Sequence, residues 1–200
     1  MLANHNQTHP TILERTLVTE HSYPPGAERY FVPDHSALEV ADLMGEAGFR
    51  TLWIKPGSKA PGLVDWPNKA SSDGQDHVDW FERHPERGLG WAMGPQDNGR
   101  FLVALDIDIV HGGGESLAIM DKDQKTLIDD MLRGWLQRTG SGGFHYVFEV
   151  PAEVGSQMKT SANLLPGIDI RGAGGQICVY PTRHPNGAIY RWREGGEPWT

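Results

Sequence analysis

The sequence predicts an α+β fold, in which an N-terminal part with helices and a short strand precedes a C-terminal antiparallel sheet. Three observations support this prediction. Apolar residues recur at helical spacing after Ser36, residues 101–110 form one long apolar strand, and the chain after Gly140 breaks into short alternating segments separated by Gly and Pro. The length of 200 residues corresponds to about one domain of ordinary size.

The N-terminal half contains two expected helices and one expected strand. Residues 1–34 are expected to form an arm that leads into a catalytic domain of residues 35–200, with two lobes at roughly 35–100 and 101–200. Ser36 suits the N-cap of the first helix, and Gly48 suits its C-terminal end. A strand at 50–54, a polar loop at 55–61 and a helix at 76–83, anchored by Trp80 and Phe81, follow.

The C-terminal half is expected to be mostly sheet. After the strand 101–110 and three consecutive glycines, residues 115–137 are predicted to form a helix with one apolar face, made by Leu127, Ile128, Met131, Leu132, Trp135 and Leu136. Four further strands are predicted at 144–150, 167–171, 176–180 and 188–193.

Composition excludes several classes of protein. The formal net charge of −8 means that any binding of nucleic acid must be local. The single Cys178 cannot form an intrachain disulfide, and it excludes zinc sites that need two or more thiolates. The sequence begins without a basic and apolar leader and contains no run of 18 apolar residues. We therefore expect a protein of the reducing cytoplasm without a membrane span.

Two carboxylates stand out on the strand 101–110. Alternate residues from Phe101 to Ile109 form an apolar face, whereas the opposite face becomes acidic at Asp106 and Asp108. Side chains two residues apart on a strand lie about 7 Å apart, so the two carboxylates repel each other. A divalent cation would relieve this repulsion, and oxygen ligands favour Mg²⁺ or Mn²⁺ over zinc. An ordinary solvent-facing pair on an amphipathic strand explains the doublet equally well.

Two other segments contain candidate functional residues. The strand at 167–171 places Asp169 and Arg171 on its polar face, an arrangement that also fits a simple salt bridge. The segment 139–148 is a glycine-rich loop that enters a strand with His145 at its second position. Such loops bind phosphate through backbone N–H groups, although they more often form tight hairpins. His145 alone also fits a half-buried structural residue.

Taken together, these segments resemble the primase-polymerase (Prim-Pol) family of the archaeo-eukaryotic primase superfamily, which occurs in plasmid, phage and CRISPR-associated replication proteins. The resemblance covers roughly residues 37–193 and depends on several motifs in order: WIKPGSKAP, LDIDIVHGGG, TGSGGFHYVF and LPGIDIRGAGGQICVYPTRHPNG. One departure is Tyr180-Pro181-Thr182, where the family often has Pro-Pro-Ser. Thr182 nevertheless keeps the hydroxyl.

The resemblance implies a fold, a metal site and a nucleotide site. The fold would be an N-terminal α/β lobe packed on a sheet lobe similar to an RNA-recognition motif, with the active site in the cleft between them. Asp106, Asp108 and Asp169 would be the catalytic residues, binding two Mg²⁺ or Mn²⁺ ions and no zinc. Contacts with nucleotide or template would come from His145, Ser141, Gly142, Gly143, Arg171, Thr182, His184, Lys55 and Lys59.

The activity implied is that of a DNA primase/polymerase, which adds nucleotides from dNTP or NTP to a 3′-hydroxyl and starts primers on single-stranded DNA. The expected partners are a single-stranded template and a primer, together with a helicase region that follows in a longer, phage- or plasmid-encoded replication protein of a bacterial cytoplasm. Two alternatives stay open. The same carboxylates could serve a metal-dependent phosphodiesterase or nuclease, or the chain could be a non-catalytic DNA-binding module of a replication initiator.

Overall fold

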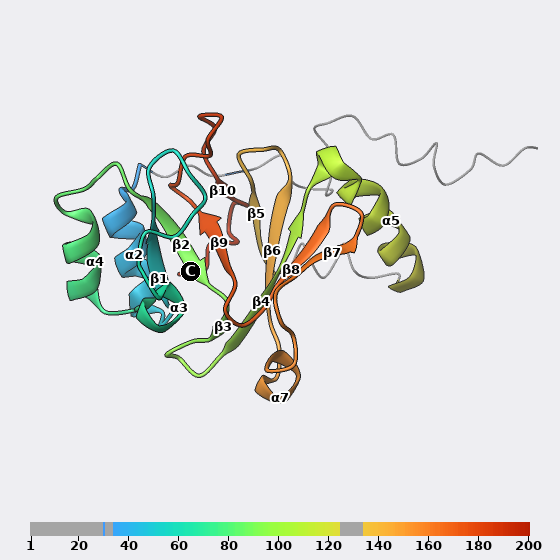
Figure 1. Ribbon diagram of the computed structural model, residues 1–200, viewed down its shortest axis with the longest axis horizontal. Coiled ribbons are helices and arrows are strands. Elements are labelled where there is room, and N and C mark those ends of the chain that lie inside the picture. Colours follow the sequence, from blue (N-terminus) through green and yellow to red (C-terminus); the bar gives the residue numbers. More distant parts are fainter. Residues whose placement is uncertain (1–29, 31–33, 125–133) are drawn as a thin grey trace, which may run out of the picture.

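The computed structural model describes residue 30, residues 34–124 and residues 134–200. They form two antiparallel sheets with helices at both ends (Figure 1). Apart from Tyr30 and Asp34, the arm predicted at 1–34 lies outside the described residues. No helix within the described part of the chain is both long and apolar enough to span a bilayer.

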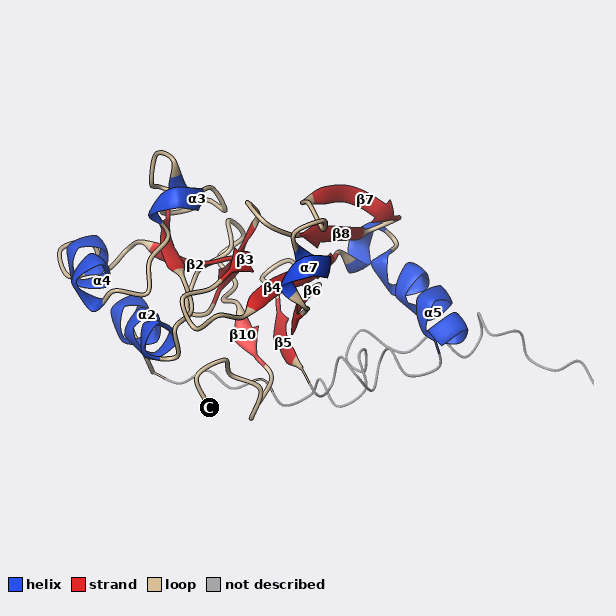
Figure 2. Ribbon diagram, turned by 90° about the horizontal axis from the view of Figure 1, so that it is seen from below, coloured by secondary structure: helices blue, strands red, loops and turns tan. Residues whose placement is uncertain are grey.

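The smaller sheet has the strand order β1-β2-β9 and consists of β1 (Thr51–Ile54), β2 (Gly88–Ala92) and β9 (Gln176–Val179). Helices α2 (Ala37–Glu46) and α4 (Gly74–Phe81) lie together beside it, with the short α3 (Trp66–Lys69) nearby (Figures 1 and 2). The sheet is completed by β9, which comes from the C-terminal part of the chain. The two sheets therefore do not follow the expected division near residue 100.

The first predicted helix is confirmed together with its cap. The hydroxyl of Ser36 accepts from the backbone N–H of Glu39, and the Glu39 carboxylate accepts from the backbone N–H of Ser36 at 2.7 Å. The second helix, α4, begins at Gly74, two residues before the predicted start, because Asp73 caps it. Trp80 and Phe81 are buried in the core, as predicted.

The larger sheet has the order β10-β5-β6-β4-β8-β7, with β3 paired to β4 at one end, and every pairing in it is antiparallel. Its strands are β3 (Gly94–Pro95), β4 (Phe101–Ile107), β5 (Trp135–Arg138), β6 (Phe144–Glu149), β7 (Ser161–Leu165), β8 (Ile168–Arg171) and β10 (Arg191–Trp192). The short helix α7 (Ala152–Gly155) follows β6. The strands predicted around 144–150 and 167–171 are thus confirmed, whereas the one at 188–193 is shorter.

Strand β4 is buried on both faces. Leu105 and Ile107 pack with Leu117 of α5 (Gly113–Gln124) on one face. Leu102 and Ala104 face the core that is shared with α2 and the smaller sheet. Asp106 projects from the same face of β4 as Leu102 and Ala104. The burial of these two apolar residues therefore fixes the position of the Asp106 carboxylate.

The strand predicted at 101–110 ends early, at Ile107. Residues Ile109–His111 form the 3₁₀ helix η1, and the Asp108 carboxylate accepts from the Val110 N–H at its start. Ile109 therefore does not continue the apolar face, and Val110 is 77% exposed. The prediction failed here because Asp108 caps η1 and so ends the strand directly after the buried Ile107.

The helix predicted at 115–137 is confirmed as far as Gln124, within α5, and is wrong at its C-terminal end. Trp135 and Leu136 belong to β5, which pairs with β6. The other four predicted apolar positions, at 127, 128, 131 and 132, lie outside the described residues. The apolar spacing at 135–136 fitted a helix, but the hairpin with β6 buries Leu136 and leaves Trp135 partly buried.

Candidate active site

A row of four polar side chains crosses the larger sheet. Gln137 on β5 is paired with His145 on β6, which is paired with Asp106 on β4, which is paired with Asp169 on β8. Directly paired residues of antiparallel strands project from the same face. The register of the strands therefore brings the predicted residues Asp106, Asp169 and His145 together and adds Gln137, which the sequence analysis placed in a helix.

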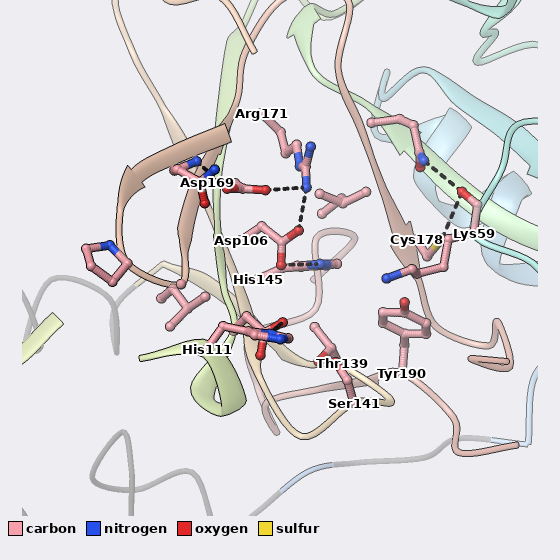
Figure 3. Close-up of a pocket in the computed structure, with 17 residues that line it drawn as sticks. Lys59, Asp106, His111, Thr139, Ser141, His145, Asp169, Arg171, Cys178 and Tyr190 are labelled. Atoms are coloured by element: carbon pink, nitrogen blue, oxygen red, sulfur yellow. Dashed lines mark hydrogen bonds and ion pairs between the residues drawn. The ribbon is translucent and has the colours of Figure 1, made fainter. Parts of the chain in front are cut away.

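Arg171 joins the two aspartates of this row. Its Nη2 atom lies 2.9 Å from Oδ2 of Asp106 and 2.9 Å from Oδ2 of Asp169 (Figure 3). The other oxygen of Asp169 accepts from the backbone N–H of Asn163 at 2.8 Å. Arg171 thus neutralises two carboxylates in this structure, and its expected contact with phosphate stays a prediction.

Asp106 is held in its ionised form. Its Oδ1 atom lies 3.4 Å from Nε2 of His145, and its Oδ2 atom accepts from Arg171. Burial by itself raises the pKa of Asp106, but the contacts with His145 and Arg171 outweigh it and bring the pKa well below its usual range. The carboxylate is thus ionised at neutral pH.

His145 is held on its edge and on its face. Its Nδ1 atom lies 2.8 Å from Nε2 of Gln137, and its ring stacks on Tyr190 with the centroids 5.8 Å apart. The side chain of Tyr190 hydrogen-bonds with the thiol of Cys178, and burial raises the pKa of both groups. The imidazole is therefore fixed, with its Nε2 edge toward Asp106.

Asp108 lies at the start of η1, beside the row. Its Oδ2 atom contacts Nδ1 of His111 at 2.7 Å, and its backbone N–H donates to Gly167 at 2.7 Å. Gly167 has a φ of +66°, and a side chain there would collide with the backbone of Asp108 and Gly113. This close approach brings the start of β8 against the end of β4.

The glycine-rich loop is a tight hairpin between β5 and β6. The N–H of Thr139 donates to Gly143, and the N–H of Gly142 donates to Thr139. Gly143 packs against the carbonyl of Ile107. Ser141 and Thr139, whose hydroxyls are 3.0 Å apart, are the loop residues that line the site. Gly142 and Gly143 shape the hairpin and do not line the cavity, and their expected contact with phosphate stays a prediction.

These side chains surround one cavity of about 510 Å³, which lies between the large sheet and β9 (Figure 3). Its lining includes seven residues predicted from the sequence: Lys59, Asp106, Asp108, Ser141, His145, Asp169 and Arg171. A model of the family described as bifunctional DNA primase/polymerase, N-terminal (Prim-Pol), matches residues 37–200. The chain belongs to the Prim-Pol family. A search of curated proteins found no match.

The remaining predicted nucleotide-binding residues of this Prim-Pol domain lie elsewhere. Lys55, Thr182 and His184 line a second cavity of about 820 Å³, which has no lining residue in common with the first. The Thr182 hydroxyl accepts from the N–H of Leu89 and donates to its carbonyl, both at 2.7 Å. Thr182 thus has a structural role at β2, and the nucleotide contact expected for it stays a prediction.

The three aspartates of the Prim-Pol domain have the donor chemistry for Mg²⁺ or Mn²⁺, because carboxylate oxygens are the ligands that these ions prefer. Every one of their six oxygens faces a nitrogen of the protein, from His145, Arg171, Val110, His111 or Asn163. Within the described ranges, no three His, Cys, Asp or Glu side chains already form a metal-binding group. The residues fit the ions in type, and Arg171 already neutralises two of the three carboxylates.

Sequence analysis missed several lining residues, namely His111, Thr139, Asn163, Cys178 and Tyr190, as well as Gln137 beneath the cavity. A signal for Gln137 was present. The segment WLQR precedes TGSGG, and FHYVFE follows it, which is the pattern of a hairpin with two alternating arms. Reading that symmetry would have placed Gln137 opposite His145.

Proposed function

We propose that this Prim-Pol domain is a template-directed DNA primase/polymerase that joins nucleotides from dNTP or NTP to a 3′-hydroxyl and starts chains on single-stranded DNA. The observation that carries the proposal is the polar row, in which Asp106 and Asp169 share one cavity with His145 and Arg171. Family membership supports primase/polymerase activity in general.

Phosphoryl transfer depends mainly on positioning and on neutralising charge. When bound by Asp106, Asp108 and Asp169, two Mg²⁺ or Mn²⁺ ions would activate the 3′-hydroxyl and neutralise the leaving pyrophosphate. The protein itself supplies the remaining contacts. The Nε2–H of His145 donates to an oxygen of the incoming triphosphate, which makes His145 an anion-binding donor and not a general base.

Arg171 has two partners in this scheme. Without nucleotide, its guanidinium neutralises Asp106 and Asp169, at 2.9 Å from each. With divalent cations held by these carboxylates, the guanidinium of Arg171 would no longer be needed to neutralise them. Arg171 then binds the triphosphate, and Lys59, which is exposed at the cavity, adds a second positive charge.

The proposed partners are a single-stranded template and a primer, bound locally because the net charge is −8. The proposed setting is the replication of a phage or plasmid in a bacterial cytoplasm, with a helicase region in the longer protein. In this proposal Lys55 and His184, which line the second cavity, contact the template.

The test is a primer-free reaction on single-stranded DNA, with dNTPs and NTPs in separate tubes and with Mg²⁺ or Mn²⁺. We expect labelled products that require a template, and no products from Asp106→Asn. Asp79→Asn, on the exposed face of α4, is the matched control and should retain activity. Degradation of labelled DNA without nucleotides would instead favour the phosphodiesterase alternative. Absence of Mn²⁺ and dNTP binding would favour the non-catalytic DNA-binding module.

A further inference from the structure

Gln137, at one end of the polar row, is a fully buried side chain. Its exposed fraction is 0%, and all its polar contacts are made within the protein. The carbonyl oxygen Oε1 accepts from the backbone N–H of Tyr180 at 3.3 Å. The amide nitrogen Nε2 donates to the carbonyl of Cys178 at 2.7 Å and lies 2.8 Å from Nδ1 of His145.

The two backbone partners fix which way the amide points. The N–H of Tyr180 can only donate, and the carbonyl of Cys178 can only accept. A reversed amide would place its NH₂ against a donor and its oxygen against an acceptor, and burial makes such mismatches costly. The amide therefore has one satisfied orientation, with an N–H of Gln137 directed at His145.

This orientation decides where the proton of the imidazole lies. An Nδ1 atom that faces an N–H donor must accept, so the ring proton is on Nε2. Nε2 lies 3.4 Å from Oδ1 of Asp106, and the His145 ring is part of the cavity lining. We propose that Gln137 is a positioning residue that fixes the tautomer and orientation of His145, so that the N–H of its Nε2 is presented to the incoming triphosphate; this role depends on the proposed function.

Gln137 also links the two sheets. Cys178 is on β9 of the smaller sheet and Tyr180 directly follows that strand, whereas Gln137 and His145 are on β5 and β6 of the larger one. Tyr190 stacks on the imidazole. The amide of Gln137 therefore couples the position of β9 to the imidazole of His145, the group that is proposed to contact nucleotide.

The first experiment reads the tautomer directly by two-bond ¹H–¹⁵N NMR correlation of the histidine rings, with His145 assigned from the His145→Ala spectrum. The unmodified domain should give the Nε2–H pattern. Gln137→Glu offers only acceptor oxygens to Nδ1, so the signal should change to a ring that is protonated at Nδ1. An Nδ1–H pattern in the unmodified domain, or an unchanged Nε2–H pattern in Gln137→Glu, would overturn the proposal.

Gln96→Leu is the matched control for the loss of a buried amide. Gln96 is 6% exposed, donates to the carbonyls of Ala92 and Gly94, and accepts from the N–H of Arg50. It therefore makes as many bonds as Gln137 but has none to His145. Gln96→Leu and Gln137→Leu should both lower the melting temperature, and only Gln137→Leu should alter the His145 signals.

The second experiment measures binding of dATP with Mg²⁺ by calorimetry. Loss of the hydrogen bond that holds His145 should weaken binding about 2- to 10-fold in Gln137→Leu and leave it unchanged in Gln96→Leu. In the background of His145→Ala, Gln137→Leu should have no further effect. Additive effects would contradict the positioning role. If the unmodified domain binds no dATP, the proposed function fails, while the NMR spectra still decide the tautomer.

Discussion

Arg171 and Asp106 lie 65 residues apart in the sequence and are joined by an N–O contact of 2.9 Å in the cavity. Because Arg171 makes an equal contact with Asp169, one guanidinium neutralises two carboxylates that would otherwise repel each other. The side chains of Arg171, Asp106 and Asp169 are between 26% and 29% exposed, so water screens the pairs only in part. This guanidinium occupies the carboxylates that a metal would use.

Replacing Arg171 should therefore strengthen the binding of metal in the absence of nucleotide. We expect Arg171→Gln to bind Mn²⁺ about 2- to 5-fold more tightly, because a partly exposed ion pair contributes at most about 1 kcal/mol. Titration calorimetry measures this affinity. Arg100→Gln is the control, since Arg100 pairs with Glu149 at 3.6 Å outside the cavity lining and should leave the affinity unchanged. Equal or weaker binding in Arg171→Gln would contradict competition.

Asp108 should separate a catalytic from a structural effect. Asp108→Asn keeps an oxygen that accepts from the N–H of Val110, whereas Asp108→Ala removes this cap. Both variants should lose primer extension, but only the alanine variant should lose stability, by about 1 kcal/mol. Urea unfolding beside an extension assay makes the comparison. A stable Asp108→Asn variant that extends primers normally would remove Asp108 from the metal site.

Acid should destabilise the domain through Asp106. Its pKa is lowered in the folded protein by His145 and Arg171. In the unfolded chain the carboxyl titrates near pH 4, about its ordinary value. The stabilisation is therefore complete above about pH 4 and is lost as the pH falls below it, because the unfolded chain takes up the proton first.

The measurement is urea unfolding between about pH 3 and pH 6 for the unmodified domain and for Asp106→Asn. The free energy of unfolding should fall more steeply with acid in the unmodified domain. Parallel curves for the two proteins would show that Asp106 makes no such contribution.

Cys178 should react slowly with thiol reagents. It is 3% exposed, and burial raises the pKa of its thiol to about 11. At about pH 8 the thiolate, which is the reactive form, is scarce in the folded protein. A chromogenic disulfide should therefore label the native domain slowly and the urea-unfolded chain rapidly, to one equivalent, because Cys178 is the single cysteine. Fast labelling of the folded domain would contradict this burial.

Local chemistry made part of the fold predictable. The capping residue Ser36 predicts the start of α2, and the apolar alternation of residues 101–107 predicts β4. Alternation places the aspartates of β4 and β8 on the polar faces of their strands, and the resemblance to the Prim-Pol family assigned them to one site. These features depend on residues close together in the sequence.

The errors occurred where distant pairing decides the outcome. Leu136 fits a helix by spacing, and only its pairing with Tyr146 makes it part of a strand. The bond between the Thr182 hydroxyl and Leu89 likewise could not be read from the sequence, because the two residues are far apart along the chain. Arg171 could be placed near an anion from the sequence, but whether that anion is phosphate or carboxylate depends on strands that meet only in the folded protein.

Strand β9 is synthesised long after β2, the strand with which it pairs, and this affects how the chain folds during synthesis. Leu89 of β2 pairs with Val179 of β9, so the smaller sheet lacks one of its three strands until about ninety further residues have been made. Until then the edge of β2 is open, and an open edge can pair with another chain. We infer that fragments ending before β9 will be prone to aggregate. We also expect the two sheets to unfold together, because β9 belongs to the smaller sheet and is hydrogen-bonded through Cys178 to Gln137 of the larger one.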